Sequence, residues 1–97
     1  MYEVRFTPDA FDDLHSLRKF EERQILREIK QQLKHTPAVE TRNRKRLRPN
    51  DLAEWEARIG DFRVFYDVDE GVKSVKIEAI GRKKGSRLVI RGEEYEL

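Results

Sequence analysis

Two arginines, at positions 58 and 63, are the side chains of this sequence best suited to chemistry on an anion. They stand on either side of Gly60-Asp61 in a stretch, Trp55 to Tyr66, that alternates apolar and polar residues. This pattern predicts a tight β-hairpin with a two-residue turn. The hairpin places Arg58 directly opposite Arg63 on one face, where like charges destabilise a sheet. The pair therefore indicates an anion-binding site.

The next strand, from Val72 to Arg82, should extend this face. If Glu70-Gly71 is the turn, Lys76 lies opposite Phe65 and Glu78 lies opposite Arg63. The predicted polar face then collects Glu56, Arg58, Arg63, Phe65, Lys76, Glu78 and Arg82, with Lys83 and Lys84 at its rim. The other face should be apolar, with Val75, Ile77 and Ala79 joining Tyr66, Val64 and Phe62.

The chemistry that suits this group is cleavage of an RNA phosphodiester without a metal ion. Arginines can stabilise the negative charge that builds up on phosphorus in the transition state. A carboxylate or a lysine can help to activate the 2′-hydroxyl. An exposed Phe65 can stack on a base.

Basic residues also cluster elsewhere, although the net charge is only +2. Five of the seven residues from Arg42 to Arg48 are basic, and so are five between Arg82 and Arg91. Such clusters are typical of a polyanion partner, usually nucleic acid. The first cluster, a predicted loop anchored by Leu47 and Leu52, supplies the candidate nucleic-acid-binding residues Arg42, Arg44, Lys45, Arg46 and Arg48, to which the face adds Phe65, Lys76 and Lys84.

Each of these features has a plainer alternative. Glu56 and Glu78 can neutralise the arginine pair from neighbouring strand positions, as in many surface ion pairs. The Arg42–Arg48 segment can be a solvated loop. Phe65 can belong to a small satellite core that a terminal segment covers.

The elements that carry these residues form an α+β pattern. Tyr2 to Phe6 alternates like a strand, and Thr7-Pro8-Asp9 is a helix start. The first helix should end near Lys19, and the second should run from about Glu21 and stop before Pro37. Their predicted buried stripes are Phe11, Leu14 and Leu17, then Ile25, Leu26, Ile29 and Leu33. With a short strand from Arg87 to Arg91, we expect an N-terminal strand and a two-helix hairpin on one face of a mainly antiparallel sheet of four to five strands.

Length and composition restrict the protein further. Ninety-seven residues suit a single domain spanning 1–97, and the absence of cysteine excludes disulfides and thiolate metal sites. His15 and His35 are too far apart in the sequence for a recognisable metal spacing, and we give neither a catalytic role. No apolar run is long enough to span a bilayer, and no signal peptide opens the sequence. We expect a cytosolic protein without a cofactor, a metal or a membrane partner.

The layout resembles the RelE/ParE superfamily of toxins from bacterial type II toxin–antitoxin systems. The resemblance covers most of the chain, including the basic segment that ends Lys45-Arg46-Leu47-Arg48-Pro49. Its most specific parts are Arg58-Ile59-Gly60-Asp61-Phe62-Arg63-Val64-Phe65-Tyr66-Asp67-Val68 and Ala79-Ile80-Gly81-Arg82-Lys83.

The resemblance implies a small α+β toxin whose surface is wrapped by a cognate antitoxin. In the RelE branch it implies entry into the ribosomal A site and metal-independent cleavage of messenger RNA by basic residues. By motif, Arg63 matches the phosphate-stabilising arginine, Arg58 one of two basic residues on the preceding strand, and Arg82 or Lys83 the basic residue after the Ile-Gly pair.

Two positions differ from that pattern. Glu56 occupies the other basic position of the first hairpin strand, where it can act as a general base. No tyrosine lies between Lys84 and Val89, and Tyr95 is the only one beyond. Two alternatives therefore stay open: inhibition of DNA gyrase, as in the ParE branch, and a non-toxic or weakly catalytic relative that binds nucleic acid or sequesters an antitoxin.

Overall fold

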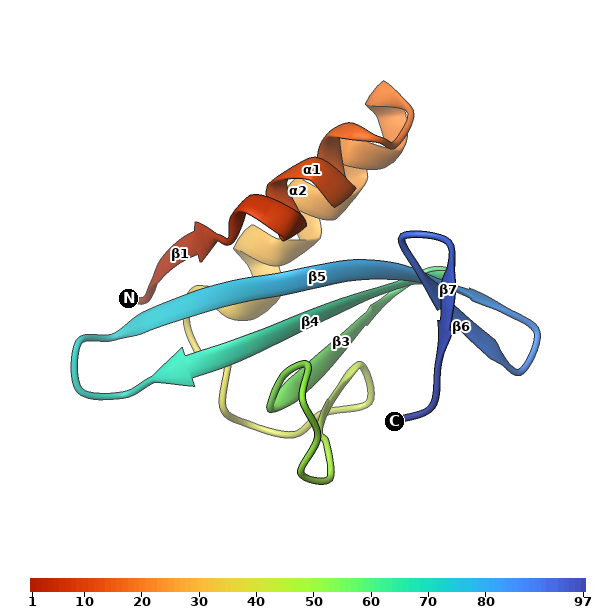
Figure 1. Cartoon of the computed structure of the whole chain (residues 1–97). Coiled ribbons are helices and arrows are strands. Elements are labelled where there is room, and N and C mark those ends of the chain that lie inside the picture. The colour runs from red at the N-terminus through yellow and green to blue at the C-terminus, as the bar shows by residue number, and fades with distance from the viewer.

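A twisted sheet of seven strands, with two helices on one face, forms the molecule (Figure 1). The computed structural model describes all residues, 1–97. The strands are β1 (Glu3–Phe6), β2 (Arg44–Arg46), β3 (Trp55–Ile59), β4 (Phe62–Asp69), β5 (Ser74–Lys84), β6 (Arg87–Ile90) and β7 (Glu93–Tyr95), and the helices are α1 (Pro8–His15) and α2 (Lys19–Leu33). Strands β2 to β7 are neighbours in sequence order, and β1 pairs in parallel with β5. The predicted α+β architecture is confirmed, with β2 and β7 as additional short strands.

Helix α1 begins as the sequence predicts and ends sooner. The Thr7 hydroxyl accepts a hydrogen bond from the Ala10 N–H at 3.1 Å, and proline opens the first turn. The helix ends at His15, short of the predicted Lys19, because Arg18 is extended and caps the start of α2. None of the helices is both long and apolar enough to cross a membrane.

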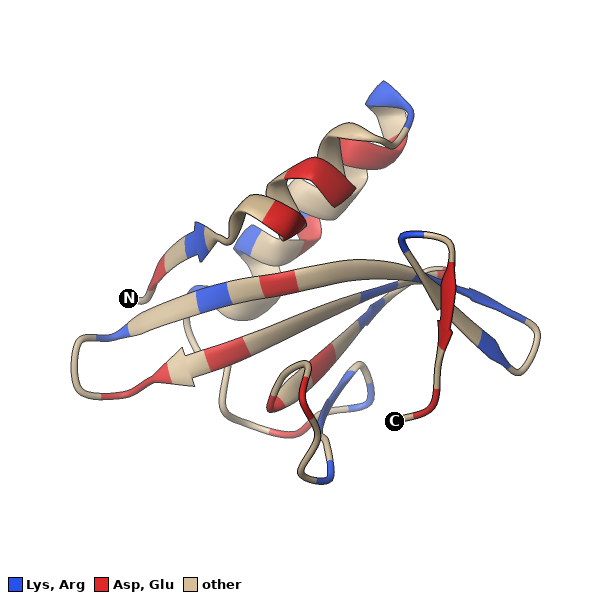
Figure 2. Ribbon diagram, in the orientation of Figure 1, with Lys and Arg blue, Asp and Glu red and all other residues tan.

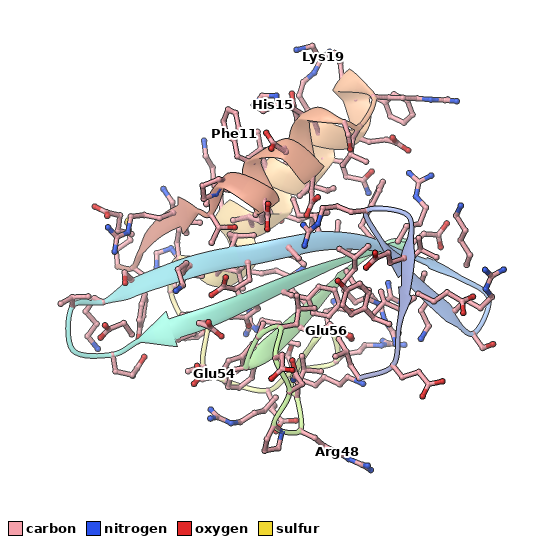
Figure 3. All side chains as sticks on the ribbon, viewed as in Figure 1. Phe11, His15, Lys19, Arg48, Glu54 and Glu56 are labelled. Carbon is pink, nitrogen blue, oxygen red and sulfur yellow. The ribbon has the colours of Figure 1, made fainter.

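The predicted buried stripe of α1 was wrong at its first position. Leu14 is buried and Leu17 is partly buried, but 52% of Phe11 is exposed. The buried side of this short helix contains Ala10 and Leu14, and Phe11 points outward against the ring of His15, with ring centroids 4.2 Å apart (Figure 3). The stripe of α2 is confirmed: Ile25, Ile29 and Leu33 are buried, and Leu26 packs at the margin of the same core.

The β3–β4 hairpin has the predicted register. Gly60-Asp61 forms the turn, and Gly60 takes a φ of +57°, which the first position of such a turn requires. The residues of the hairpin on the helix side belong to the main core: Trp55, Ala57, Ile59, Phe62, Val64 and Tyr66. The opposite face of the sheet, which we call the open face, therefore receives Arg58, Arg63 and Phe65.

The predicted register of β5 was wrong, for two reasons. The β4–β5 turn is longer than Glu70-Gly71, since Asp69 pairs with Ser74. A β-bulge then adds Glu78 as an extra residue between the pairs Tyr66–Ile77 and Phe65–Ala79. Because one added residue reverses the side of every residue after it, Ala79 moves to the open face and Ile80 takes the predicted place of Ala79 in the main core.

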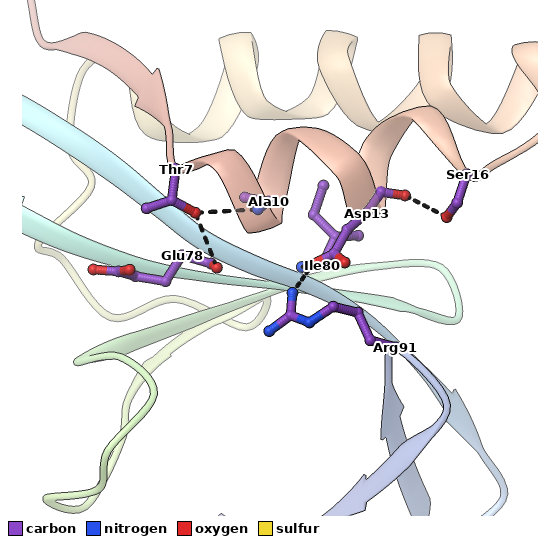
Figure 4. A network of polar contacts seen from close by, with 7 residues as sticks. All are labelled: Thr7, Ala10, Asp13, Ser16, Glu78, Ile80 and Arg91. Carbon is purple, nitrogen blue, oxygen red and sulfur yellow. Dashed lines mark hydrogen bonds and ion pairs between the residues drawn. The ribbon is translucent and has the colours of Figure 1, made fainter.

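Helix α1 holds this bulge in place (Figure 4). At its start, the Thr7 N–H donates to the Ile77 carbonyl at 3.0 Å and the Thr7 hydroxyl donates to the Glu78 carbonyl at 3.3 Å. At its end, the buried Asp13 carboxylate accepts the Ile80 N–H at 3.0 Å. The backbone on both sides of the extra residue is therefore bound by α1.

The C-terminal hairpin β6–β7 covers a second, smaller core. Its buried members are Ala53, Phe65, Ala79, Leu88 and Ile90, with Leu47, Leu52 and Tyr95 packed at their margin. Leu47 and Leu52 anchor the loop before β3, as the sequence predicts. At Gly81, an added Cβ would lie 2.7 Å from Ile90 Cγ1, so only glycine allows β6 to approach this closely.

Candidate functional site

Arg58 and Arg63 face each other across the β3–β4 hairpin on the open face, as the sequence predicts. The Arg63 guanidinium is held in place at the turn, because Nη1 donates to the carbonyls of Gly60 and Phe62, each at 2.9 Å. The Arg58 side chain is exposed, while its backbone N–H donates to the Asn43 carbonyl at 2.7 Å. One arginine is thus fixed and its partner is free to reach a ligand.

No acidic side chain forms an ion pair with either arginine of this pair. The molecule contains seven ion pairs, and none includes Arg58 or Arg63. Glu78 was predicted opposite Arg63, but the bulge puts Gly81 there and Glu78 pairs with Lys76 at 3.2 Å. Glu56 lies beside Lys45 and Phe65 in the sheet register. The alternative in which Glu56 and Glu78 compensate the pair is therefore wrong.

Arg82 and Lys83 lie on opposite faces. Arg82 pairs with Phe62 on the helix side, where its guanidinium lies 4.6 Å from the Phe62 ring centroid and 2.9 Å from Glu21 Oε2 of α2. The predicted place of Arg82 on the open face was wrong, because the bulge reverses its side. Lys83 is exposed opposite Leu88, a member of the second core, and therefore belongs to the open face.

The predicted base-stacking role of Phe65 is also excluded. Phe65 is fully buried, because the loop with Leu47 and Leu52 and the C-terminal Tyr95 cover it. The alternative environment for Phe65, a small satellite core covered by a terminal segment, is confirmed. Tyr95 is half-buried in this cover, opposite Leu88.

The basic segment before β3 divides into one structural and four exposed cations. Arg44 was predicted to bind nucleic acid, but it is buried. Its guanidinium donates to the carbonyls of Gln32 and Val39 and to the Thr36 hydroxyl, which fixes the chain after α2. The others are exposed: Arg42, Lys45, Arg46 and Arg48. Lys45 lies on the open face opposite Glu56, and Arg46 lies on the other side, 5.9 Å from the Trp55 ring centroid.

Charged residues are unevenly distributed along the strands of the sheet (Figure 2). Arg58, Arg63 and Lys83 lie towards the end at which β3 turns into β4. Towards the other end lie Glu78, Lys76 and Asp67, with the loop of Arg48 and Glu54 beside them, where the Glu54 N–H donates to Asp67 Oδ1 at 2.8 Å (Figure 3). Burial and the adjacent Asp67 carboxyl raise the pKa of Glu78, and Lys76 opposes this shift. The predicted binding residue Lys76 is therefore engaged by an acid.

The exposed Lys84 follows Lys83 at the end of β5 and lies opposite Arg87. Arg87 in turn pairs with Glu94 of β7. No group of three or more histidine, cysteine, aspartate or glutamate side chains is arranged to hold a metal ion.

Comparisons with known proteins agree with this fold and motif set. A family model described as the ParE toxin of the type II toxin–antitoxin system parDE matches residues 4–86. The chain belongs to the RelE/ParE superfamily of type II toxins. No curated protein matches it.

Two solved structures resemble this toxin over most of its length. A chain of the toxin–antitoxin complex RelBE2 from Mycobacterium tuberculosis is 30% identical, with a TM-score of 0.70, and the match covers 84% of this toxin and 98% of that chain. A chain of the archaeal RelE–RelB complex from Pyrococcus horikoshii OT3 is 26% identical, with a TM-score of 0.68, and the match covers 88% of this toxin and 97% of that chain.

Sequence reasoning missed one pair of residues in this toxin. Asp13 of α1 is almost completely buried, and its Oδ2 accepts a hydrogen bond from Arg91 Nη1 at 2.6 Å. Arg91 lies in the turn between β6 and β7. The pair joins α1 to the hairpin that covers Phe65 (Figure 4). The position of Asp13 next to the apolar stripe of a helix could have indicated a buried carboxylate. Its partner Arg91 could not be inferred, because it is 78 residues away in the sequence.

Proposed function

We propose that this toxin is a metal-independent endonuclease that cleaves messenger RNA on the ribosome and thereby stops translation. The observation that carries the proposal is the group Arg58, Arg63 and Lys83, three cations on one face without an acidic partner. Unpaired cations at neighbouring positions favour the binding of a phosphate. Such a group can also stabilise the additional negative charge of the transition state in which phosphorus is pentacoordinate.

The roles follow from position. Arg63, fixed by the turn carbonyls, suits the stabilisation of the phosphoryl oxygens, because its geometry does not need to be organised during the reaction. Glu56 lies two residues from Arg58 on the same face of β3 and suits the removal of the 2′-hydroxyl proton. The exposed Arg42, Lys45 and Arg48 supply further contacts to the nucleic-acid backbone. Arg46 and Lys84 alternate onto the helix side of β2 and β5.

Expression of the toxin alone should stop incorporation of labelled amino acids. Arg63→Ala should lower the rate of messenger RNA cleavage by about 100-fold or more, because it removes a preorganised charge. Unchanged protein synthesis during growth arrest would contradict the proposal.

The neighbours Arg82 and Lys83 provide a matched pair of variants. Lys83→Ala should reduce cleavage without lowering the stability of the fold, because this side chain is exposed and unpaired. Arg82→Ala should lower the free energy of unfolding, by removing the contacts with Phe62 and Glu21, and should leave cleavage by the folded fraction nearly intact. Primer-extension mapping of cleaved messages, with chemical denaturation, separates the two effects.

A protein partner belongs to the same proposal. The two similar solved structures are toxin–antitoxin complexes, which supports an antitoxin that binds this toxin as well.

Inhibition of DNA gyrase is the second candidate. The description of the matched family model as a ParE toxin favours it, and so does the burial of Phe65, which removes the base platform that the sequence predicts. In this case labelled thymidine incorporation should stop before amino-acid incorporation, and the purified toxin should inhibit supercoiling by gyrase. Arg63→Ala should then have little effect.

A further inference from the structure

The segment 93–97, which consists of β7 and the two residues after it, is acidic and contains no basic residue. Its three glutamates, Glu93, Glu94 and Glu96, are all exposed. Glu94 pairs with Arg87, whereas Glu93 and Glu96 take part in none of the ion pairs of the molecule. The β6–β7 hairpin follows residue 86, where the match to the family model ends. Two unpaired carboxylates therefore lie in a part of this toxin that the family model does not include.

Glu93 lies in the same row across the sheet as the arginine pair. Arg58 is opposite Arg63, and Arg63 is opposite Gly81. Gly81 packs closely against Ile90, which is opposite Glu93. Because residues opposite one another point to the same face, Glu93 is on the open face together with the two arginines. Neighbouring strands are about 4.8 Å apart, so Glu93 stands about 15 Å from Arg63 along this row.

The rest of the segment continues over the open face. Tyr95 is opposite Leu88, which is opposite Lys83, so its ring lies on the face of the proposed active site. There it helps to cover Phe65. Further on, Glu96 and the loop before β3 line a cavity of about 740 Å³. Figure 2 shows β7 as an acidic strand beside the basic end of β5.

Few contacts hold this segment in place. β7 is an edge strand that is bonded to β6 alone, and Tyr95 is the only residue of the segment that is not exposed. In the turn before β7, Arg91 takes a φ of +51°, which residues other than glycine rarely adopt, and its side chain is held by Asp13. Short edge strands with exposed side chains open at low cost. β7 can therefore separate from β6 while the rest of the sheet stays folded.

We propose that the segment 93–97 is an autoinhibitory strap that RNA must displace to bind the open face. An RNA strand that extends from Arg58 and Arg63 along the row brings further phosphates near Glu93. Like charges repel strongly within the Debye length, which is about 10 Å at moderate ionic strength. Separation of β7 from β6 removes this repulsion. The inference rests on the proposed function, because it takes the polyanion on the open face to be RNA.

The first test removes the charge and keeps the segment. Glu93→Gln/Glu96→Gln should bind a 2′-O-methyl oligonucleotide, which lacks the attacking hydroxyl, about threefold more tightly than wild type in low salt. Fluorescence anisotropy measures the affinity. The gain should disappear in high salt, which screens the repulsion. Equal affinities of this variant and wild type in low salt would overturn the proposal.

The control for this test is Asp12→Asn/Glu40→Gln. It also removes two negative charges, from exposed residues in α1 and in the loop after α2 that take part in no ion pair. The control should bind the oligonucleotide nearly as wild type does. A gain as large as that of Glu93→Gln/Glu96→Gln would assign the effect to net charge and would overturn the strap.

The second test prevents the displacement. Val89 and Glu94 are opposite each other on β6 and β7, and the toxin has no cysteine. Val89→Cys/Glu94→Cys can therefore form a single disulfide that keeps β7 on β6. The oxidised form should bind the oligonucleotide about threefold or more weakly than the same protein after reduction, because its open state is no longer populated. Equal affinities would show that β7 stays in place and would overturn the displacement.

The two tests also separate the strap from the proposed function. If wild-type toxin binds the oligonucleotide and neither test changes the affinity, only the strap is overturned. If wild-type toxin and all variants fail to bind it in low salt, the proposed function fails, and the strap fails with it.

Discussion

Single residues decide which side chains can meet on the open face. Glu78 is one extra residue in β5, and it moves Arg82 to the helix side and Lys83 to the open face. The sequence motif offers both residues as partners of the arginine pair. Only Lys83 lies on the same face as that pair, because the Arg82 side chain is bound by Glu21 and stacked on Phe62 on the helix side.

The two phenylalanines that differ most from their predicted environments give a matched test of burial. Phe65→Ala should lower the free energy of unfolding by about 3–5 kcal/mol, because it leaves a cavity in the second core. Phe11→Ala should change it by less than about 0.5 kcal/mol, since about half of this side chain is already in water. Chemical denaturation of both variants measures these changes. An equal loss in the free energy of unfolding would contradict the buried environment of Phe65 and the exposed environment of Phe11.

Glu78 should also make stability depend on pH. Its pKa in the folded state lies above the ordinary value of 4.5, so the folded state binds the proton more tightly than the unfolded state. The stabilisation that Glu78 contributes is therefore complete below pH 4.5 and is lost as pH rises through the raised pKa. Glu78→Gln should remove this loss of stability, so the difference in stability between neutral and acidic pH should be smaller in the variant than in wild type.

The control for this effect is Glu40→Gln, which removes one negative charge from an exposed residue away from Asp67 and Lys76. The free energy of unfolding, measured by chemical denaturation from pH 4 to pH 8, should depend less on pH in Glu78→Gln than in wild type. In Glu40→Gln its pH dependence should be unchanged. A pH dependence that survives in Glu78→Gln would assign it to other groups.

At the scale of elements, α1 sets the geometry of β5. Thr7 and Asp13, at the two ends of this eight-residue helix, bind the backbone of β5 on either side of the bulge. Asp13 also holds Arg91, which fixes the β6–β7 hairpin over Phe65. A helix on one face of the sheet thus determines what the other face presents.

Asp13→Ala should therefore destabilise both β5 and the C-terminal hairpin. We expect a loss of about 1–3 kcal/mol in the free energy of unfolding, because the Ile80 N–H is left buried without an acceptor. Faster exchange of the Ile80 amide should accompany it. Asp12→Ala, at the exposed neighbouring position, is the control and should behave like wild type. Unchanged exchange at Ile80 in Asp13→Ala would show that the bulge does not need α1.

At the scale of the whole molecule, the sheet separates two surfaces. The open face carries the unpaired cations of the proposed active site, and the two helices cover the opposite face (Figure 1). Because Lys30 and Lys34 lie in the last turn and at the end of α2, Lys30→Glu/Lys34→Glu leaves the open face unchanged and should stop growth as strongly as wild-type toxin when expressed alone. A loss of toxicity in this variant, if it is stably folded, would mean that the two surfaces act together.

Local patterns in the sequence determined the hairpin of the site and the positions of the two helices. The Gly60-Asp61 turn fixed the register of its hairpin and the opposition of Arg58 and Arg63, the Thr7 cap fixed the start of α1, and the spacing of Ile25, Ile29 and Leu33 fixed the buried side of α2. Each of these depends on residues within a few positions of one another. The α+β class followed from the same patterns.

Only the tertiary structure decided the rest of the site. The bulge at Glu78 is held by a contact between Asp13 and Ile80, 67 residues apart, and Phe65 is buried by a loop and a C-terminal strand that alternation cannot place. A period of two predicts the side of a strand residue only while the ladder is unbroken. One extra residue, stabilised from a distant helix, was therefore enough to exchange Arg82 for Lys83 on the face where the chemistry is proposed.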